Sequence, residues 1–271
     1  MAQLSPRGAV AGYLRKYPLA PRYGRSQRLA LEASDGTRLA AHRLAGPPDA
    51  KATVVVVHGF VNSSRTPAVH AFAHLLADDV DVIVPDLRGH GRSGGVCTFG
   101  RDEPLDVAAA VAAADPAKPV VTIGVSLGGA AVLLHAGRNP GAVAGVVAVS
   151  APVSWGGVGT PGAQRIERWV ATPRGRLVLR TLLNTRLSAS QDGAGEPPDA
   201  AAVAASIAPA FTIVVADPHD WYFGPEHPEA IHEWAQDPKE LWWYPGGGHG
   251  TDLLTTAFAA RLLAAIDRHL S

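Results

Sequence analysis

Apolar residues of the chain gather in short continuous runs that are separated by longer segments of mixed character. The runs are rich in β-branched residues and occupy residues 53–57, 80–84, 120–125, 143–149, 211–215 and, in a shorter form, 241–244. Continuous apolar runs of this length are typical of strands that helices bury on both faces. The pattern therefore predicts a sheet whose strands are mostly parallel.

Helical spacing of apolar residues characterises the segments between these runs. It predicts helices over residues 67–77, 104–114, 130–138 and 253–270. In the last of these the large apolar residues recur at every fourth position, at Leu254, Phe258, Leu262, Ile266 and Leu270. Strand and helix alternate, which predicts an α/β fold with a doubly wound sheet, right-handed crossovers and a ligand site at the carboxyl ends of the strands.

The beginning of the predicted sheet follows a different pattern. Residues 30–42 contain two alternating segments on either side of the pair Asp35-Gly36. An Asp-Gly pair in this position is the strongest short-range signal for a β-hairpin. We expect an antiparallel N-terminal hairpin at one edge of the sheet.

One interval, residues 152–198, breaks the alternation of strand and helix. It contains two helix-like stretches at 164–170 and 175–187, with no clear strand between them. A stretch rich in Gly and Pro, residues 191–198, follows and predicts a flexible return linker. Because the interval follows the sixth predicted strand, we expect it to form a small helical cap over the active edge of the sheet.

The predicted cap divides the chain into three parts. Residues 29–151 and 199–271 form the core, residues 152–198 the cap insertion, and residues 1–28 a basic N-terminal extension. The extension contains six Arg and Lys residues and no acidic residue, and its prolines interrupt any helix. A solvated extension is the favoured interpretation, with a partner-binding arm as the alternative.

Composition narrows the function classes. The 24 Lys and Arg residues balance 24 Asp and Glu residues among 271, so no global field attracts nucleic acid or an anionic membrane. Apolar residues make up 47% of the chain, enough for a large core, but no run approaches the roughly 20 residues of a membrane span. Cys97 is the single cysteine and excludes an internal disulfide. With no clear signal peptide, a cytoplasmic location is the default expectation.

A candidate nucleophile lies at residues 124–129, whose sequence is Gly-Val-Ser-Leu-Gly-Gly. It follows a predicted strand and precedes a predicted helix, the context that a G-x-S-x-G nucleophile elbow requires. The tight turn would project the Ser126 hydroxyl above the sheet, and the glycines allow neighbouring segments to approach. Taken alone, the motif also fits a Gly-rich turn with an incidental serine.

A second motif strengthens this interpretation, because His58-Gly59-Phe60 ends the first buried strand. With both motifs the chain resembles the α/β-hydrolase superfamily of serine esterases, lipases and thioesterases, and the resemblance extends from Glu32 to the C-terminus. It implies that the backbone N–H groups of Phe60 and Leu127 form an oxyanion hole. For His58 we expect a role in organising the loop.

The segment 86–93 also resembles the superfamily, in which a D-x-R-G-x-G-x-S stretch often follows the next parallel strand. The segment contains three residues of types that can act in catalysis, Asp86, Arg88 and His90. We favour a structural role for them, in which local hydrogen bonds fix a tight Gly-rich loop. Cys97, which follows, has no base beside it in the sequence and is expected to be a spectator.

The resemblance places the general base in a loop near the C-terminus, where His249 lies within a run of glycines. Imidazole exchanges protons near neutral pH, which suits a general base. The orienting acid comes from the end of the preceding strand, where two candidates occur. Relatives commonly have a glycine three residues before the acid; matching that pattern favours Asp220, whereas Asp217 occupies the glycine position and remains the alternative.

These residues predict a serine hydrolase that cleaves a carboxylic ester, or a thioester, through Ser126, His249 and Asp220 and an acyl-enzyme intermediate. The expected partner is a small-molecule acyl substrate, and no cofactor or metal is expected. His227 and His232 do not form a convincing metal-ligand pair. A non-catalytic binding protein on the same fold, and an acyltransferase or lyase that uses the same serine, remain alternatives.

Substrate preference is the least determined property. Trp155, Trp169 and Trp221 are candidate substrate-binding residues, although apolar cap residues could equally pack the cap onto the sheet. The excess of arginine in the cap favours an anionic substrate or a phosphopantetheine thioester, with a solvated helix face as the alternative. Nothing in the sequence indicates an oligomeric state.

Overall fold

A computed structural model describes residues 26–153, 160–188 and 199–271 of the chain and contains an eight-stranded sheet. The strands are β1 (Gln27–Glu32), β2 (Arg38–Leu44), β3 (Thr53–Val57), β4 (Asp81–Pro85), β5 (Val120–Val125), β6 (Gly145–Val149), β7 (Phe211–Ala216) and β8 (Lys239–Trp243). Their order in the sheet is β1-β2-β4-β3-β5-β6-β7-β8. From β4 to β8 all neighbours are parallel, which confirms the predicted doubly wound α/β sheet.

The antiparallel part of the sheet lies where the sequence predicts it. β1 pairs antiparallel with β2, and the register runs from Glu32 opposite Arg38 to Gln27 opposite Arg43. Gly36 in the connecting turn has a φ of 81°, which glycine adopts without steric cost. β2 then pairs antiparallel with β4, so the hairpin forms one edge of the sheet.

Helices connect the strands. They are α2 (Pro67–Leu76), α3 (Glu103–Ala112), α4 (Leu127–Arg138), α5 (Pro161–Val170), α6 (Pro173–Leu182), α7 (Ala200–Ala204), α8 (Glu226–Trp234) and α9 (Thr256–Leu270). The sequence pattern predicts neither α7 nor α8, and it places the start of the last helix at residue 253. Residues 250–253 instead form a 3₁₀ turn, and α9 begins after Thr255, whose hydroxyl accepts a hydrogen bond from the Phe258 N–H as an N-cap.

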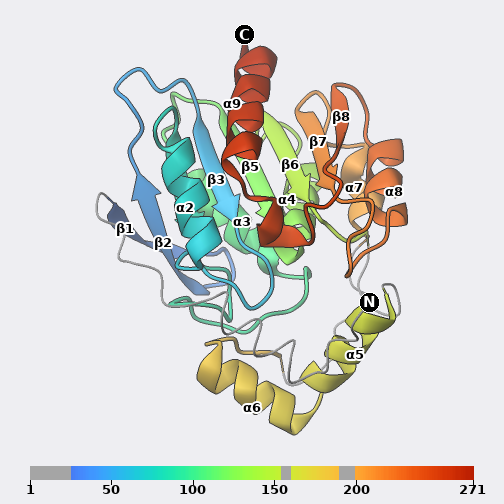
Figure 1. Cartoon of the computed structure of the whole chain (residues 1–271). Coiled ribbons are helices and arrows are strands. Elements are labelled where there is room, and N and C mark those ends of the chain that lie inside the picture. The colour runs from blue at the N-terminus through green and yellow to red at the C-terminus, as the bar shows by residue number, and fades with distance from the viewer. Residues whose placement is uncertain (1–25, 154–159, 189–198) are drawn as a thin grey trace.

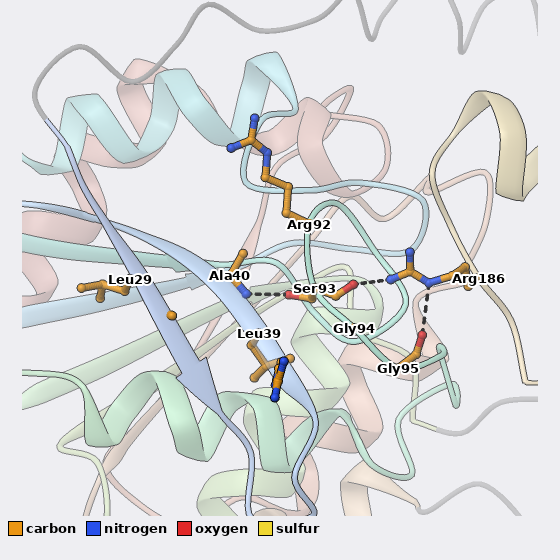
Figure 2. Close-up of a pocket in the computed structure, with 10 residues that line it drawn as sticks. Leu29, Leu39, Ala40, Arg92, Ser93, Gly94, Gly95 and Arg186 are labelled. Carbon is orange, nitrogen blue, oxygen red and sulfur yellow. Dashed lines mark hydrogen bonds between the residues drawn. The ribbon is translucent and has the colours of Figure 1, made fainter.

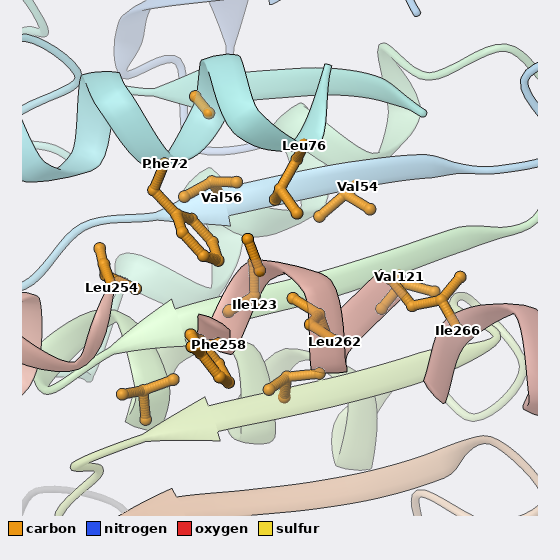
Figure 3. Packing of buried hydrophobic residues seen from close by; sticks show 14 of the residues in the cluster. Val54, Val56, Phe72, Leu76, Val121, Ile123, Leu254, Phe258, Leu262 and Ile266 are labelled. Atoms are coloured by element: carbon orange, nitrogen blue, oxygen red, sulfur yellow. The ribbon is translucent and has the colours of Figure 1, made fainter. Parts of the chain in front are cut away.

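One face of the sheet packs against α2 and α9 (Figure 1). Figure 3 shows Phe72 of α2 beside Phe258 of α9, with the two rings stacked 5.6 Å apart over β3 and β5. The valines and isoleucines of the parallel strands that point to this face, such as Val54, Val56 and Ile123, are fully buried in the same cluster. The periodic apolar face predicted for the last helix is therefore a core face.

The opposite face of the sheet is covered by α3, α4, α7 and α8. α4 is buried along nearly its whole length, so both of its sides pack against protein. Because both faces of the sheet are covered, its polar chemistry concentrates at the carboxyl ends of the strands.

Helices α5 and α6 lie beyond this carboxyl edge, below the sheet in Figure 1. One end of their segment is fixed where the Thr160 N–H donates to the Tyr222 carbonyl and the Thr160 hydroxyl to the Trp221 carbonyl. The other end is fixed by backbone hydrogen bonds from Arg186 to Gly89 and from Cys97 to Arg186. Both anchors are loops that follow strands of the sheet.

Several predictions fall outside the described residues: nearly all of the basic extension, at 1–25, Trp155, and the return linker at 191–198. Within the described ranges, no helix combines the length and apolarity that crossing a membrane would need.

Candidate active site

Ser126 occupies a sharp turn between β5 and α4. Its φ of 53° lies in the left-handed region, which is strained for a residue with a side chain. Glycines make the turn feasible: a Cβ on Gly124 would lie 2.1 Å from the Gly128 carbonyl oxygen, and one on Gly128 would lie 2.5 Å from the Val57 carbonyl oxygen. The turn thus matches the strand–turn–helix geometry of a nucleophile elbow.

The Ser126 hydroxyl oxygen lies 3.2 Å from Nε2 of His249. On the other side of the ring, the Nδ1–H of His249 donates to Oδ2 of Asp220 at 2.7 Å. These contacts fix one tautomer, in which Nε2 carries a lone pair toward the serine. Three side chains from the ends of β5, β7 and β8 thus form one continuous chain of hydrogen bonds.

Asp220 is well suited to orient the imidazole because its second oxygen is also held. Oδ1 accepts the backbone N–H groups of Tyr222 at 2.7 Å and Phe223 at 3.2 Å. The Asp220 side chain is only 2% exposed, whereas the imidazole of His249 is 13% exposed. The Asp220 carboxylate is therefore buried and fixed, and the imidazole of His249 has some access to solvent.

Asp217, the alternative acid, bonds to backbone atoms. Its Oδ1 accepts the His219 N–H at 2.9 Å, and its Oδ2 accepts the Gly248 N–H at 2.8 Å. The imidazole bond of His249 goes to Asp220, the residue that the sequence analysis favoured. Asp220 thus bonds to the imidazole, whereas Asp217 bonds to the backbone of the loop that contains His249.

The backbone N–H groups expected to form the oxyanion hole belong to Leu127 and Phe60. Leu127 is the first residue of α4, whose initial N–H groups have no acceptor within the helix. Phe60 follows Gly59, and a Cβ on Gly59 would lie 3.3 Å from Cβ of Ser126. The Gly59–Phe60 segment therefore passes close to the serine.

His58 connects two loops beneath this segment. Its Nδ1–H donates to the Gly59 carbonyl at 2.8 Å, and its Nε2 accepts the Leu87 N–H at 3.0 Å. The ring is fully buried, which lowers its pKa, and the bond from the Leu87 N–H requires a lone pair on Nε2. The predicted role of His58 in organising the loop is confirmed.

Hydrogen bonds hold the segment 86–93, but only those within the segment are the local bonds that the sequence predicts; Asp86 and Arg88 also bond to residues distant in sequence. Asp86 accepts the N–H groups of Ser64 at 2.7 Å and Arg92 at 2.8 Å. The Nδ1–H of His90 donates to the Arg88 carbonyl at 2.9 Å, and burial lowers the pKa of this histidine to about 3. None of these bonds reaches Ser126 or His249.

Arg88 ties the same segment to the rest of the molecule. It is 4% exposed and donates to Asp106 on α3 through Nε at 2.9 Å and Nη2 at 2.7 Å. Its Nη1 donates to Asp35 in the β1–β2 turn at 2.7 Å. Cys97 is buried nearby, and burial raises the pKa of its thiol well above the usual value, which fits the predicted spectator role.

An aromatic wall surrounds the imidazole of His249. It consists of Trp221, Tyr222 and Phe223, whose ring centres lie 5.6, 5.2 and 5.6 Å from the imidazole centre. Trp221 is 52% exposed although it contacts the imidazole, so its outer face is available to a ligand. Trp169 lies on α5, half-buried, while Trp155 lies outside the described residues.

The arginines of residues 160–188, the segment that the sequence predicts to be a cap, have mixed roles. Nη1 of Arg176 donates to the Ser188 carbonyl at 2.9 Å, and Arg168 donates to the Gln164 carbonyl. Arg186 donates to the Ser93 and Gly95 carbonyls and so connects the cap segment to the loop after β4 (Figure 2). Three of these arginines therefore bond to protein carbonyls, which weakens the sequence argument for an anionic substrate.

The hollow in Figure 2 has a volume of about 420 Å³. Leu29, Leu39 and Ala40 line one side, and the segment 92–95 with Arg186 lines the other. Neither Ser126 nor His249 takes part, so this hollow is separate from the candidate active site. Among the residues with described placement, no group of three His, Cys, Asp or Glu side chains is arranged to hold a metal ion.

Sequence reasoning missed Ser150, whose hydroxyl accepts the Gly250 N–H at 3.1 Å. Ser150 directly follows β6, which lies between β5 and β7, the strands that precede Ser126 and Asp220. Its position at the carboxyl edge of the sheet was the one sequence signal for a role of Ser150. That signal is weak because serine is common in such loops.

Known proteins resemble this chain in sequence and in fold. A family model described as serine aminopeptidase, S33, matches residues 48–194. Lipase LipV of Mycobacterium tuberculosis is 33% identical over 110 residues, which cover 41% of each protein. The match thus spans less than half of the length of that curated relative.

Solved structures match over most of the chain. An esterase of Pyrococcus furiosus superposes with a TM-score of 0.70 at 17% identity, covering 100% of this chain and 96% of the esterase. An esterase of a Rhodococcus species superposes with a TM-score of 0.69 at 21% identity, covering 89% and 98%. At these identities the likeness establishes the shared fold.

Proposed function

Because the chain belongs to the serine aminopeptidase S33 family of the α/β-hydrolase superfamily, we propose that it is a serine hydrolase that cleaves carboxylic esters of small molecules. The observation that carries the proposal is the continuous chain of hydrogen bonds from Asp220 through His249 to Ser126. The names of its relatives, esterases and a lipase, favour an ester over an amide.

Acylation begins at Ser126. His249 Nε2 takes the hydroxyl proton as the Ser126 oxygen attacks the ester carbonyl carbon, and the carbonyl π bond opens to an oxyanion. The N–H groups of Phe60 and Leu127 donate to that oxyanion. In other enzymes each such donor stabilises the transition state by about 3–4 kcal/mol. The oxyanion then collapses, the C–O bond to the alcohol breaks, and His249 gives its proton to the leaving oxygen.

Deacylation repeats these steps with water as the nucleophile. His249 Nε2 takes a proton from water, whose oxygen attacks the acyl carbon of the Ser126 ester. Collapse of the second tetrahedral intermediate returns the proton to the Ser126 oxygen and releases a carboxylic acid. Asp220 keeps its charge throughout, holds the Nδ1–H tautomer and stabilises the imidazolium.

The aromatic wall suggests where the substrate lies. Trp221 contacts the imidazole and exposes its outer face, so we propose that it contacts the acyl or alcohol group next to the scissile bond. Trp169 on α5 is a proposed second contact from the cap, and Trp155 belongs to the same proposal. A thioester would react by the same steps, with a thiolate as the leaving group.

The proposal is tested with p-nitrophenyl esters of graded acyl length, a matched thioester series and aminoacyl p-nitroanilides. We expect ester turnover that Ser126→Ala reduces to background and an alanine substitution of a distant serine, Ser271→Ala, leaves unchanged. Release of the free acid, with no transfer to an added alcohol or amine, would distinguish hydrolysis from acyl transfer. Ester turnover that survives in Ser126→Ala would refute the assignment of the nucleophile.

A further inference from the structure

His249 lies in a loop that has little intrinsic rigidity. The preceding run is Gly246-Gly247-Gly248, and Gly246, Gly248 and Gly250 all have a positive φ between 63° and 79°. Glycines restrict the backbone less than other residues, so such a loop has many conformations unless other groups select one. Since the imidazole must meet both Ser126 and Asp220, the backbone of this loop has to be held from outside.

Two buried side chains bond to the residues on either side of His249. The Asp217 carboxylate accepts the N–H of Gly248 at 2.8 Å, and the Ser150 hydroxyl accepts the N–H of Gly250 at 3.1 Å. Both Asp217 and Ser150 are 3% exposed. The loop is therefore fixed immediately before and immediately after the histidine.

Each of these two side chains is itself attached to the sheet. Ser150 follows β6, and its N–H donates to the Val215 carbonyl of β7 at 2.8 Å. The residue before it, Val149, accepts the N–H of Ser126 at 2.8 Å. One dipeptide, Val149-Ser150, thus holds the backbone of the candidate nucleophile and, through its hydroxyl, the loop of the candidate base.

Asp217 is attached in a similar way. It directly follows β7 and begins the turn there, and its other oxygen accepts the His219 N–H at 2.9 Å. Burial opposes ionisation of this carboxyl, but the N–H groups of His219 and Gly248 outweigh burial and leave its pKa below the usual value. A charged acceptor makes a stronger hydrogen bond to a backbone N–H than a neutral one.

We propose that Asp217 and Ser150 are positioning residues that clamp the loop on both sides of His249 and so hold its imidazole in line between Ser126 and Asp220. The inference rests on the proposed function, because it assigns these residues a purpose in acyl transfer. It also gives a reason for the departure at residue 217, where the resemblance to relatives leads us to expect glycine. A glycine there could not bond to the Gly248 N–H.

The test compares kcat and KM for the best ester of the panel in Asp217→Gly, Asp217→Asn and Ser150→Ala. We expect kcat to fall about 100-fold in Asp217→Gly and about 10-fold in the other two, because small misplacements of catalytic groups cost rates of this size. KM should stay within about twofold, since neither residue belongs to the proposed substrate contacts. Asn retains one acceptor oxygen, so its partial rescue relative to Gly is part of the prediction.

Asp199→Asn is the matched control. Asp199 also accepts two backbone N–H groups, those of Ala201 and Ala202, but at the start of α7. The Asp199→Asn substitution should lower Tm without changing kcat. If Asp217→Asn and Ser150→Ala behave like this control, with a lower Tm and an unchanged kcat, the clamp is refuted even when Asp217→Gly fails to fold.

The same series separates failure of the clamp from failure of the proposed function. Ser126→Ala tests the nucleophile without reference to the clamp. Activity that is lost in Asp217→Asn but normal in Asp220→Asn would also overturn the inference, because Asp217 would then be the orienting acid.

Discussion

Two parts of the carboxyl edge of the sheet contain the same residue types and use them differently. In the loop after β4, the side chains of Asp86, His90 and Ser93 bond to backbone groups: Asp86 to two N–H groups, His90 to a carbonyl, and Ser93 to a carbonyl and an N–H. These contacts fix the shape of the loop and join it to β2 and to the loop after β3.

The loops after β5, β7 and β8 also supply a serine, an aspartate and a histidine. There Ser126, His249 and Asp220 bond to one another, side chain to side chain. The comparison shows that residue types alone do not mark a catalytic site. The distinguishing feature is a hydrogen-bonded chain of side chains that ends at a hydroxyl on a strained turn.

The largest expected contrast between the two regions is in kcat. Asp220→Asn should lower kcat by about 10⁴-fold, because an amide would no longer hold the required imidazole tautomer. Asp86→Asn removes one backbone acceptor from the other region and should lower the free energy of unfolding by about 1–3 kcal/mol. Steady-state kinetics of both folded variants checks the difference, and a similar loss of kcat in Asp86→Asn would erase the distinction.

The next effect concerns stability and belongs to the β4 region. Arg88→Met would leave the buried carboxylate of Asp106 without its partner, which typically costs about 3–5 kcal/mol. Chemical denaturation measures this loss. The kcat of the remaining folded protein should stay within a few-fold of the original value, whereas loss of kcat with unchanged stability would assign Arg88 to the chemistry.

A smaller effect is expected at the aromatic wall. The Trp221 ring contacts His249, and its outer face is exposed to solvent. We expect Trp221→Ala to raise KM by about 10-fold, because a loss of roughly 1.4 kcal/mol of binding free energy corresponds to that factor. Trp234→Ala is the control, because Trp234 is 57% exposed on α8 and contributes to no described part of the site. Equal KM values in both variants would remove Trp221 from the substrate contacts.

The smallest effect is the pH dependence of the Asp35–Arg88 pair. The hydrogen bond from Arg88 lowers the pKa of Asp35 to about 2. A lowered carboxyl pKa stabilises the folded state above the unfolded pKa of about 4, and this contribution disappears as the pH falls through about 2. Because Asp35 is partly exposed, the difference in unfolding free energy from Asp35→Asn should be at most about 1 kcal/mol. A difference that is undiminished at pH 2 would contradict this assignment.

Much of the fold could be predicted because the core strands have an unmistakable pattern. The valine-rich runs at β3 and β5 fit strands that are buried on both faces and fit few other structures. The pair Asp35-Gly36 specifies the turn between β1 and β2. Helix α8 lacks such a pattern: its sequence contains Pro228 and few large apolar residues, so its helical state depends on packing against β7.

The sequence predicts which residue types form the candidate site better than it predicts which of them are in contact. The glycines around Ser126 indicate an elbow because only glycine fits there. The choice between Asp217 and Asp220 depends on which side chain turns toward the imidazole, and three residues of spacing do not determine that. Ser150 was missed because its role requires Gly250, which is distant in sequence, to be adjacent in space.

The central claim is that Ser126 is a nucleophile activated by His249, and a fluorophosphonate probe with peptide mass mapping tests it most directly. We predict one adduct, on the peptide that contains Ser126, with no labelling of Ser126→Ala and much slower labelling of Asp220→Asn. An adduct on a different serine, or a folded protein that hydrolyses esters while Ser126 stays unlabelled, would contradict the account.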